Sequence, residues 1–166
     1  ALGNGGDLTV GASSVIYSNY EGKITGNASS TLNVDGLGTV YLAGDNSGMA
    51  GTVNVDKGTL NIRGNDDVLG TGTTVVDNGG NLQVQGGLNI GNDITLNGTG
   101  TTVNGALQNF SGNNTFSGTV TLATDTLIAS DAGNLTISGN VAGGANDLTV
   151  GGVGNTTLSG GVTSST

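Results

Sequence analysis

The chain contains no cysteine, proline, tryptophan or histidine. Without cysteine there is no disulfide framework, no thiolate metal site and no cysteine nucleophile. Without histidine the chain lacks the commonest general base, the usual partner of a serine nucleophile and the commonest metal ligand. We therefore expect neither enzymatic activity nor a cofactor.

Charge is also scarce, because Asp, Glu, Lys and Arg together make up 9% of the residues. Only Lys23, Lys57 and Arg63 are basic, and the net charge of −9 repels nucleic acid and anionic lipid. No apolar run approaches the ~18 residues of a membrane-spanning helix, and no basic-then-apolar leader is present. We expect no nucleic-acid partner and no membrane insertion by this segment.

Glycine is abundant, at 34 of 166 residues, and apolar residues make up 34% of the chain. The apolar residues alternate with polar ones in short pairs flanked by Asp, Asn or Gly. Period-two alternation between turn formers predicts many short strands, and no apolar stripe has helical spacing. The chain is therefore predicted to be all-β. Examples of the pairs are Leu8 and Val10, Leu32 and Val34, Leu60 and Ile62, and Leu82 and Val84.

Related strands recur about every 21 residues. The spacings are 20 from Val40 to Leu60, 22 from Leu60 to Leu82, 22 from Val53 to Val75 and 21 from Leu82 to Val103. A period of this length is typical of a solenoid, in which the rest of each coil is the crossover that parallel strands need. We predict a parallel β-helix (β-solenoid) of about eight coils of ~20–22 residues. An antiparallel sandwich with Asn-Gly hairpins is the alternative.

Residues 1–166 are predicted to form a single β-solenoid segment. Residues 1–30 fit the pattern less well, and a loop or bulge is expected over the aromatic stretch 15–21. Asp56-Lys-Gly58 and Asp77-Asn-Gly-Gly80 occupy equivalent corners, where glycine permits positive φ. Asparagines stacked at such corners are expected to form hydrogen-bonded ladders.

Residues 48–100 carry a resemblance to a known family. The matching stretches are Ala50–Ile62 and Val68–Leu82, and Gly112–Leu122 matches more loosely. They resemble the autotransporter-associated β-strand repeat, found in passenger domains of bacterial surface proteins. The resemblance implies export to the cell surface, a right-handed β-helix and a stalk or adhesin role, and it implies no catalytic residue.

Asp66 and Asp67 are the only adjacent acidic pair in the sequence. Two carboxylates ~5–9.5 Å apart are what glycoside hydrolysis needs, but no second acidic cluster accompanies the pair, and a solvated corner is the simpler interpretation. A carbohydrate-binding or glycan-cleaving β-helix would use this pair with nearby Arg63 or with the Tyr17 and Tyr20 patch.

Two further sites have simple alternatives. Residues 143–158 are similar to the calcium-binding glycine-rich nonapeptide, with Asp147 as a weak calcium candidate, but Thr156 stands where a second copy needs aspartate. Ranks of outward threonines would suit ice binding, although strand propensity also explains them. The pairs considered are Thr71 and Thr73, Thr99 and Thr101, and Thr119 and Thr121.

Neither end of the sequence carries an obvious polar cap, and capping coils normally keep a solenoid soluble. An uncapped end is an open strand edge that pairs with an identical molecule, head to tail, or with further coils of a longer chain. The sequence thus predicts a structural protein, secreted or on the bacterial cell surface, that acts as a stalk, an adhesin shaft or a fibre subunit. Surface glycans are the other candidate partners.

Overall fold

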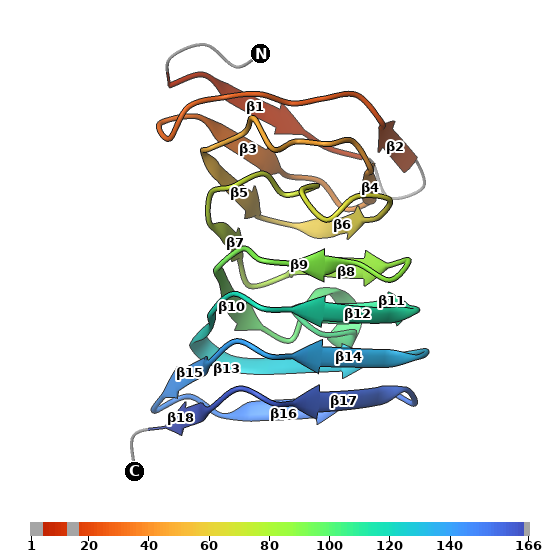
Figure 1. Ribbon diagram of the computed structural model, residues 1–166, viewed down its shortest axis with the longest axis vertical. Coiled ribbons are helices and arrows are strands. Elements are labelled where there is room, and N and C mark those ends of the chain that lie inside the picture. The colour runs from red at the N-terminus through yellow and green to blue at the C-terminus, as the bar shows by residue number, and fades with distance from the viewer. Residues whose placement is uncertain (1–4, 13–16, 165–166) are drawn as a thin grey trace.

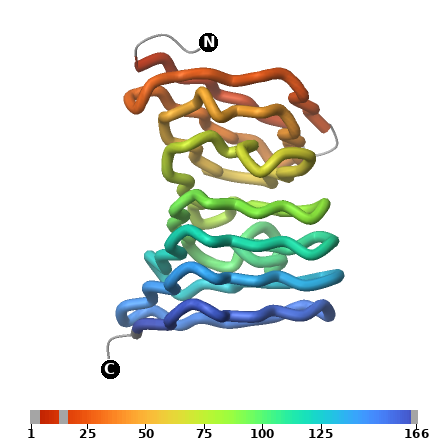
Figure 2. The backbone as a smooth tube through the Cα atoms, viewed as in Figure 1, coloured from red at the N-terminus to blue at the C-terminus, as the bar shows by residue number. Residues whose placement is uncertain are grey.

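The chain folds into a parallel β-solenoid of about seven turns in a computed structural model, which describes residues 5–12 and 17–164. The coils stack from the N-terminal end to the C-terminal end of the rod (Figures 1 and 2). Strands of successive coils pair in parallel on three faces. This arrangement confirms the predicted fold class and excludes the antiparallel sandwich.

The first and second faces belong to one 14-stranded sheet, joined through the long strand β13 (Val120–Ser130). The first face comprises β1 (Asp7–Val10), β3 (Thr31–Val34), β5 (Thr52–Val55), β7 (Thr74–Val76), β10 (Ile94–Gly98), the start of β13, β15 (Val141–Gly144) and β18 (Val162–Ser164). The second comprises β2 (Tyr17–Tyr20), β4 (Thr39–Leu42), β6 (Gly58–Ile62), β8 (Gly80–Gln85), β11 (Leu107–Ser111), the end of β13 and β16 (Leu148–Gly151).

The third face is a four-stranded sheet that exists only in the C-terminal half of the rod. It comprises β9 (Asn89–Ile90), β12 (Asn113–Phe116), β14 (Asn134–Ile137) and β17 (Asn155–Leu158). In the preceding coils the chain crosses this side of the rod in turns. Among the described residues the single helix is the short 3-10 helix η1 (Thr101–Val103), and none is long and apolar enough to cross a bilayer.

Alternation along each strand places aliphatic side chains inside the rod, one above another. On the second face the inward column contains Val40, Leu60, Leu82, Leu107 and Ile128, all of them buried. Burying each such side chain contributes about 1.5–3 kcal/mol, so the columns hold the coils together.

The predicted register is confirmed at two of its four spacings, since Val40 pairs with Leu60 and Leu60 pairs with Leu82. The Leu82–Val103 spacing is wrong, because Leu82 pairs with Leu107. The chain leaves the rod between β10 and β11, so this coil advances 26 residues from Ile94 to Val120.

The Val53–Val75 spacing is wrong by one residue. Val53 pairs with Thr74, which places Thr74 and Val76 inside the rod and leaves Val75 on the outer side. Val75 and Val76 are adjacent in the sequence, so both fit the apolar pattern. Pairing along the strand decides which of them is buried.

Glycine lets the coils stack closely at the corner that follows the third face. A methyl group on Gly139 would overlap the carbonyl oxygen of Gly118, and one on Gly160 would overlap that of Gly139. Gly58, at a predicted corner, has a φ of 71° and its Cβ would meet the carbonyl of Gly36. Glycine is therefore required at these corners on steric grounds.

Asparagine side chains join consecutive coils. Buried Asn46 accepts a hydrogen bond from the Ile24 backbone amide at 2.7 Å and donates to the Val68 carbonyl at 2.7 Å. A second asparagine contact lies on the strands of the first face and not at the corners where ladders were predicted, because Asn54 in β5 donates to Asn33 in β3 at 2.9 Å.

The N-terminal coil differs in length from those that follow. It advances 24 residues, from Asp7 to its partner Thr31, whereas the next coil advances 21. Of the stretch where a loop or bulge was predicted, residues 15 and 16 lie outside the described residues, and Tyr17–Tyr20 form β2, which pairs with β4.

Candidate functional site

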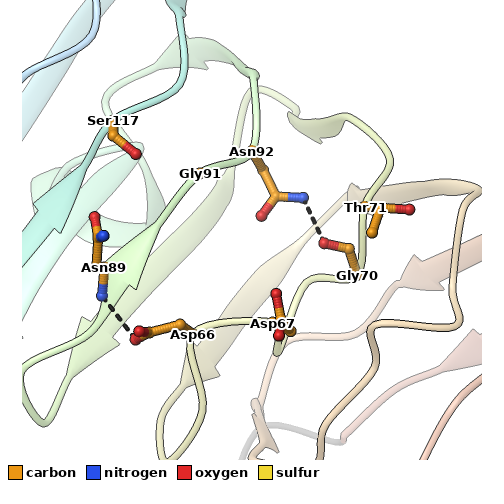
Figure 3. Close-up of a pocket in the computed structure, with 8 residues that line it drawn as sticks. All are labelled: Asp66, Asp67, Gly70, Thr71, Asn89, Gly91, Asn92 and Ser117. Carbon is orange, nitrogen blue, oxygen red and sulfur yellow. Dashed lines mark hydrogen bonds between the residues drawn. The ribbon is translucent and has the colours of Figure 1, made fainter.

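A solvent-open cavity of about 510 Å³ lies beside the predicted acidic pair (Figure 3). Its lining is mostly polar and comes from three successive coils. The lining residues are Asp66, Asp67, Gly70, Thr71, Asn89, Gly91, Asn92 and Ser117. The cavity thus offers carboxylate, amide and hydroxyl groups to a ligand.

The cavity forms where the third face changes from turns to strands. Asp66 and Asp67 begin a turn whose next residues, Val68 and Leu69, are buried in the core. Asn65 caps this turn, because its Oδ1 accepts a hydrogen bond from the Asp67 backbone amide at 2.7 Å. In the next coil the same side of the rod is strand β9, and the change of backbone shape leaves the hollow.

The two carboxylates have different surroundings. Asp66 Oδ1 accepts a hydrogen bond from the Asn89 backbone amide at 2.8 Å, so this carboxylate joins two coils. The Asp67 side chain turns away from that bond (Figure 3). Both residues are exposed. The arrangement suits binding of a polar ligand, with Asp67 as the freer of the two carboxylates.

Asn92 lines the cavity and joins two coils. Its Nδ2 donates to the Gly70 carbonyl at 3.0 Å and to the Gly72 carbonyl at 2.7 Å, and its side chain is buried. These two bonds hold the coil that carries the acidic pair against the following one. Nothing in the sequence pattern distinguished Asn92 or Asn89 from the many other asparagines.

Arg63 and the tyrosines lie apart from the cavity lining. The Arg63 guanidinium sits 4.4 Å from the Tyr41 ring centroid and donates to Asn19 Oδ1 at 3.1 Å. Tyr17 is 70% exposed and its ring centroid lies 5.7 Å from that of Tyr41. Tyr20 instead contributes to an apolar space between the first coils. The structure therefore divides the predicted glycan-site residues between separate places.

An ordered polar surface, which the sequence analysis missed, adjoins the cavity. On the outer side of the third face the pattern Asn-x-Thr-x-Ser recurs at 21-residue intervals in three consecutive coils. We call this surface the Asn-Thr-Ser face. It consists of Asn113, Thr115 and Ser117, then Asn134, Thr136 and Ser138, then Asn155, Thr157 and Ser159. The repeat itself was the signal that would have found it.

Figure 1 shows β12, β14 and β17 one above another, and their pairing stacks the asparagines and the threonines in columns. Asn155 donates to Asn134 at 3.0 Å, so the asparagine column is partly bonded along itself. The Ser117 hydroxyl donates to a backbone carbonyl of the preceding coil at 3.3 Å, and the Ser138 hydroxyl does the same at 3.4 Å. The threonine column between them therefore presents the freest hydroxyl groups.

The calcium candidate Asp147 lies beside Asp125. Asp125 lies one coil earlier, and its Oδ1 accepts a hydrogen bond from the Asp147 backbone amide at 2.9 Å. Within residues 5–12 and 17–164, no three acidic, histidine or cysteine side chains gather as metal ligands would. The Asp125 carboxylate acts as a backbone cap at this corner.

The threonine pairs considered for ice binding lie on different parts of the rod. Thr71 is at the cavity, Thr101 is in η1, and Thr121 is on the first face. They form no common plane.

The C-terminal coil leaves its inward-facing side chains open. Val141 is fully buried, but Val162, its partner in the next coil, is 53% exposed. Likewise Ile128 is fully buried and its partner Val150 is 47% exposed. Strands β16, β17 and β18 pair with the preceding coil alone among the described strands.

No model of a known protein family, no curated protein and no solved structure matches the chain.

Proposed function

We propose that the protein is a structural β-solenoid module, a secreted or cell-surface rod that serves as a stalk, adhesin shaft or fibre subunit. The proposal rests on one observation above all: the parallel strand pairing continues to the last described coil, where the core is open at Val150 and Val162. An added parallel coil would cover both side chains and pair the free strand edges.

The occupant of this edge is the first coil of a second copy or a further coil of a longer chain. In either case the rod lengthens along its own axis, because a head-to-tail contact between unlike ends repeats without closing. The lack of cysteine and the presence of only three basic residues suit exposure to oxidants and to trypsin-like proteases outside the cell.

The experiment compares the purified chain with a double variant, Val150→Lys and Val162→Lys, by sedimentation and negative-stain electron microscopy. A lysine at each position places a charge on the open core edge, where burial would be costly. We expect the unmodified chain to form rods longer than one molecule and the double variant to remain monomeric.

Val153→Lys is the matched control, since Val153 is 95% exposed and lies on a turn of the same coil. It should assemble like the unmodified chain. An unmodified chain that stays monomeric at high concentration would overturn end-to-end assembly. Surface labelling of intact producing cells with an antibody against the chain tests the proposed location.

A second candidate function is binding of a carbohydrate in the Asp66–Asp67 cavity. It is favoured by the position of the cavity at the predicted acidic pair and by its amide and hydroxyl lining. Sugars offer hydroxyl groups that both donate and accept hydrogen bonds, and such a lining complements them. Binding is favoured over cleavage because the Asp66 carboxylate is already bonded to the backbone.

Calorimetric titration with a panel of neutral oligosaccharides tests this candidate. Asp67→Asn should weaken binding by about fivefold, the effect of exchanging one charged hydrogen-bond acceptor for a neutral group. Asp45→Asn, on an exposed corner elsewhere, is the control. Release of reducing sugar ends that stops in Asp67→Asn would show that the site also cleaves its ligand.

A further inference from the structure

The Asn-Thr-Ser face and the Asp66–Asp67 cavity form one continuous surface. Asn89 and Ser117 line the cavity, and Asn89 pairs directly with Thr115 at the head of the threonine column. Below Thr115 the column continues through Thr136 and Thr157. A ligand bound in the cavity therefore meets this column as soon as it extends toward the C-terminal end.

We propose that this surface binds an extended, neutral, β-linked polysaccharide that lies along the rod axis, with about one sugar unit on each coil. The inference rests on carbohydrate binding in the cavity, the second candidate function above, and extends it to a polymer track.

Spacing is the first argument. Successive coils stack ~4.8 Å apart, which is close to the advance of one sugar unit in an extended β-linked chain. Each coil then presents the same asparagine, threonine and serine to each successive sugar. A repeating surface of this kind matches a repeating polymer, whereas a compact ligand would use only one coil of it.

Side-chain chemistry is the second argument. The threonines are half-exposed or exposed, and none of the three has a side-chain hydrogen bond within the described residues. Each therefore offers a hydroxyl that both donates and accepts, held by a β-branched side chain with few rotamers. The methyl group on the same carbon can pack against the apolar C–H groups of a sugar ring.

Charge is the third argument, and it selects the class of polysaccharide. The nine residues of the Asn-Thr-Ser face are uncharged, while Asp66 and Asp67 lie at its upper end and the whole chain carries −9. Uronate-rich or sulfated glycans would be repelled. Neutral glucans and N-acetylated amino-sugar polymers meet no such barrier.

The test measures affinity against ligand length, using cello- and chito-oligosaccharides from the disaccharide to the hexasaccharide. Affinity of the unmodified chain should rise with each added sugar until the ligand spans the five coils from the Asp66–Asp67 turn to β17. Thr136→Val keeps the side-chain shape but removes the hydroxyl. It should weaken binding of the hexasaccharide about fivefold and leave the affinity for the disaccharide unchanged. Thr121→Val, exposed on the first face, should change neither.

The possible outcomes separate the proposals. Equal affinity for short and long ligands, with no effect of Thr136→Val, would overturn the track and leave the cavity site standing. No affinity for any oligosaccharide would overturn both. Ice shaping or thermal hysteresis that Thr136→Val abolishes, without glycan affinity, would instead identify the face as an ice-binding array. Circular dichroism and thermal melting of each variant show whether it has folded.

Discussion

Thr74 lies directly against Val53 of the preceding coil, inside the rod, and its hydroxyl has no hydrogen-bond partner among the described residues. The residue is fully buried. A buried hydroxyl that has left water without finding a partner costs free energy, so this position weakens an otherwise aliphatic column.

Thr74→Val should therefore raise the free energy of unfolding by about 1 kcal/mol, because it replaces the unpaired hydroxyl with a methyl group of similar size. Chemical denaturation monitored by circular dichroism measures the change. Thr52→Val, on a half-buried outward position of the same face, should move stability by less than about 0.5 kcal/mol. A destabilised Thr74→Val would mean that the hydroxyl is satisfied by water.

Gly139→Ala should destabilise the rod by about 1–3 kcal/mol, the usual cost of forcing an extra group into a packed site. The added methyl would overlap the backbone carbonyl of Gly118, which cannot move without separating two coils. Thermal melting measures the loss.

Gly22→Ala is the matched control for Gly139→Ala. A Cβ at Gly22 meets no atom within 4 Å, and its φ is not positive. This variant should be stabilised by about 0.4–1 kcal/mol, since alanine narrows the unfolded ensemble. Equal effects of the two substitutions on stability would show that the coils are not closely stacked at the Gly139 corner.

Asp56 should make the rod less stable as pH rises. Its pKa is raised above 3.8, chiefly by burial and then by repulsion from Asp77 and Asp35, the aspartates of the neighbouring coils, and Lys57 opposes this only partly. A raised folded-state pKa means that the stabilising contribution is present below pH 3.8 and is lost as pH rises through the folded value.

Asp56→Asn should accordingly be more stable than the unmodified chain at pH 7, and the two should converge near pH 3. Asp45→Asn should change the stability in the opposite direction. A hydrogen bond from the Ser47 backbone amide and the nearby Lys23 ammonium lower the pKa of Asp45. This variant should lose stability at pH 7 and converge in acid. Urea denaturation across this pH range distinguishes the pair; parallel curves would contradict the assignment.

Val103→Gly should stabilise the rod by about 1 kcal/mol. Val103 has a φ of 58°, a left-handed conformation that a β-branched residue adopts only under strain, and its side chain is 72% exposed. Differential scanning calorimetry measures the shift. Val153→Gly, also exposed but without positive φ, should instead lose about 0.4–1 kcal/mol, because glycine gives the unfolded chain more freedom. A melting temperature lowered in Val103→Gly would indicate that Val103 makes a stabilising contact.

The fold was predictable because each inward column repeats at a nearly constant interval. Leu60 and Leu82 follow that interval and pair as expected. Leu107 does not, because extra residues precede it, and one of them, Val103, is apolar and stands at the expected spacing although its side chain is 72% exposed. A period detects coils of equal length, and it fails where one coil is longer.

The candidate site was predictable only in part. Asp66 and Asp67 stand out as an acidic pair, but the cavity beside them depends on a turn in one coil meeting a strand in the next. Arg63 is close to them in sequence and yet its guanidinium contacts Tyr41. The outward threonines that align in the fold are Thr115, Thr136 and Thr157. The spacing in the sequence had pointed to other threonines, such as Thr71 and Thr101, which lie on different parts of the rod.

The strands on either side of the longer coil between β10 and β11 still pair in parallel with their neighbours, with register shifts between Leu96 and Gly98 and between Asn109 and Ser111. The extra residues between β10 and β11 therefore do not prevent the parallel pairing of the strands. A peptide epitope or a small domain grafted between Gly98 and Gly105 would be displayed from the side of the rod without disturbing its repeat. The molecule already contains the attachment point of a modular display scaffold.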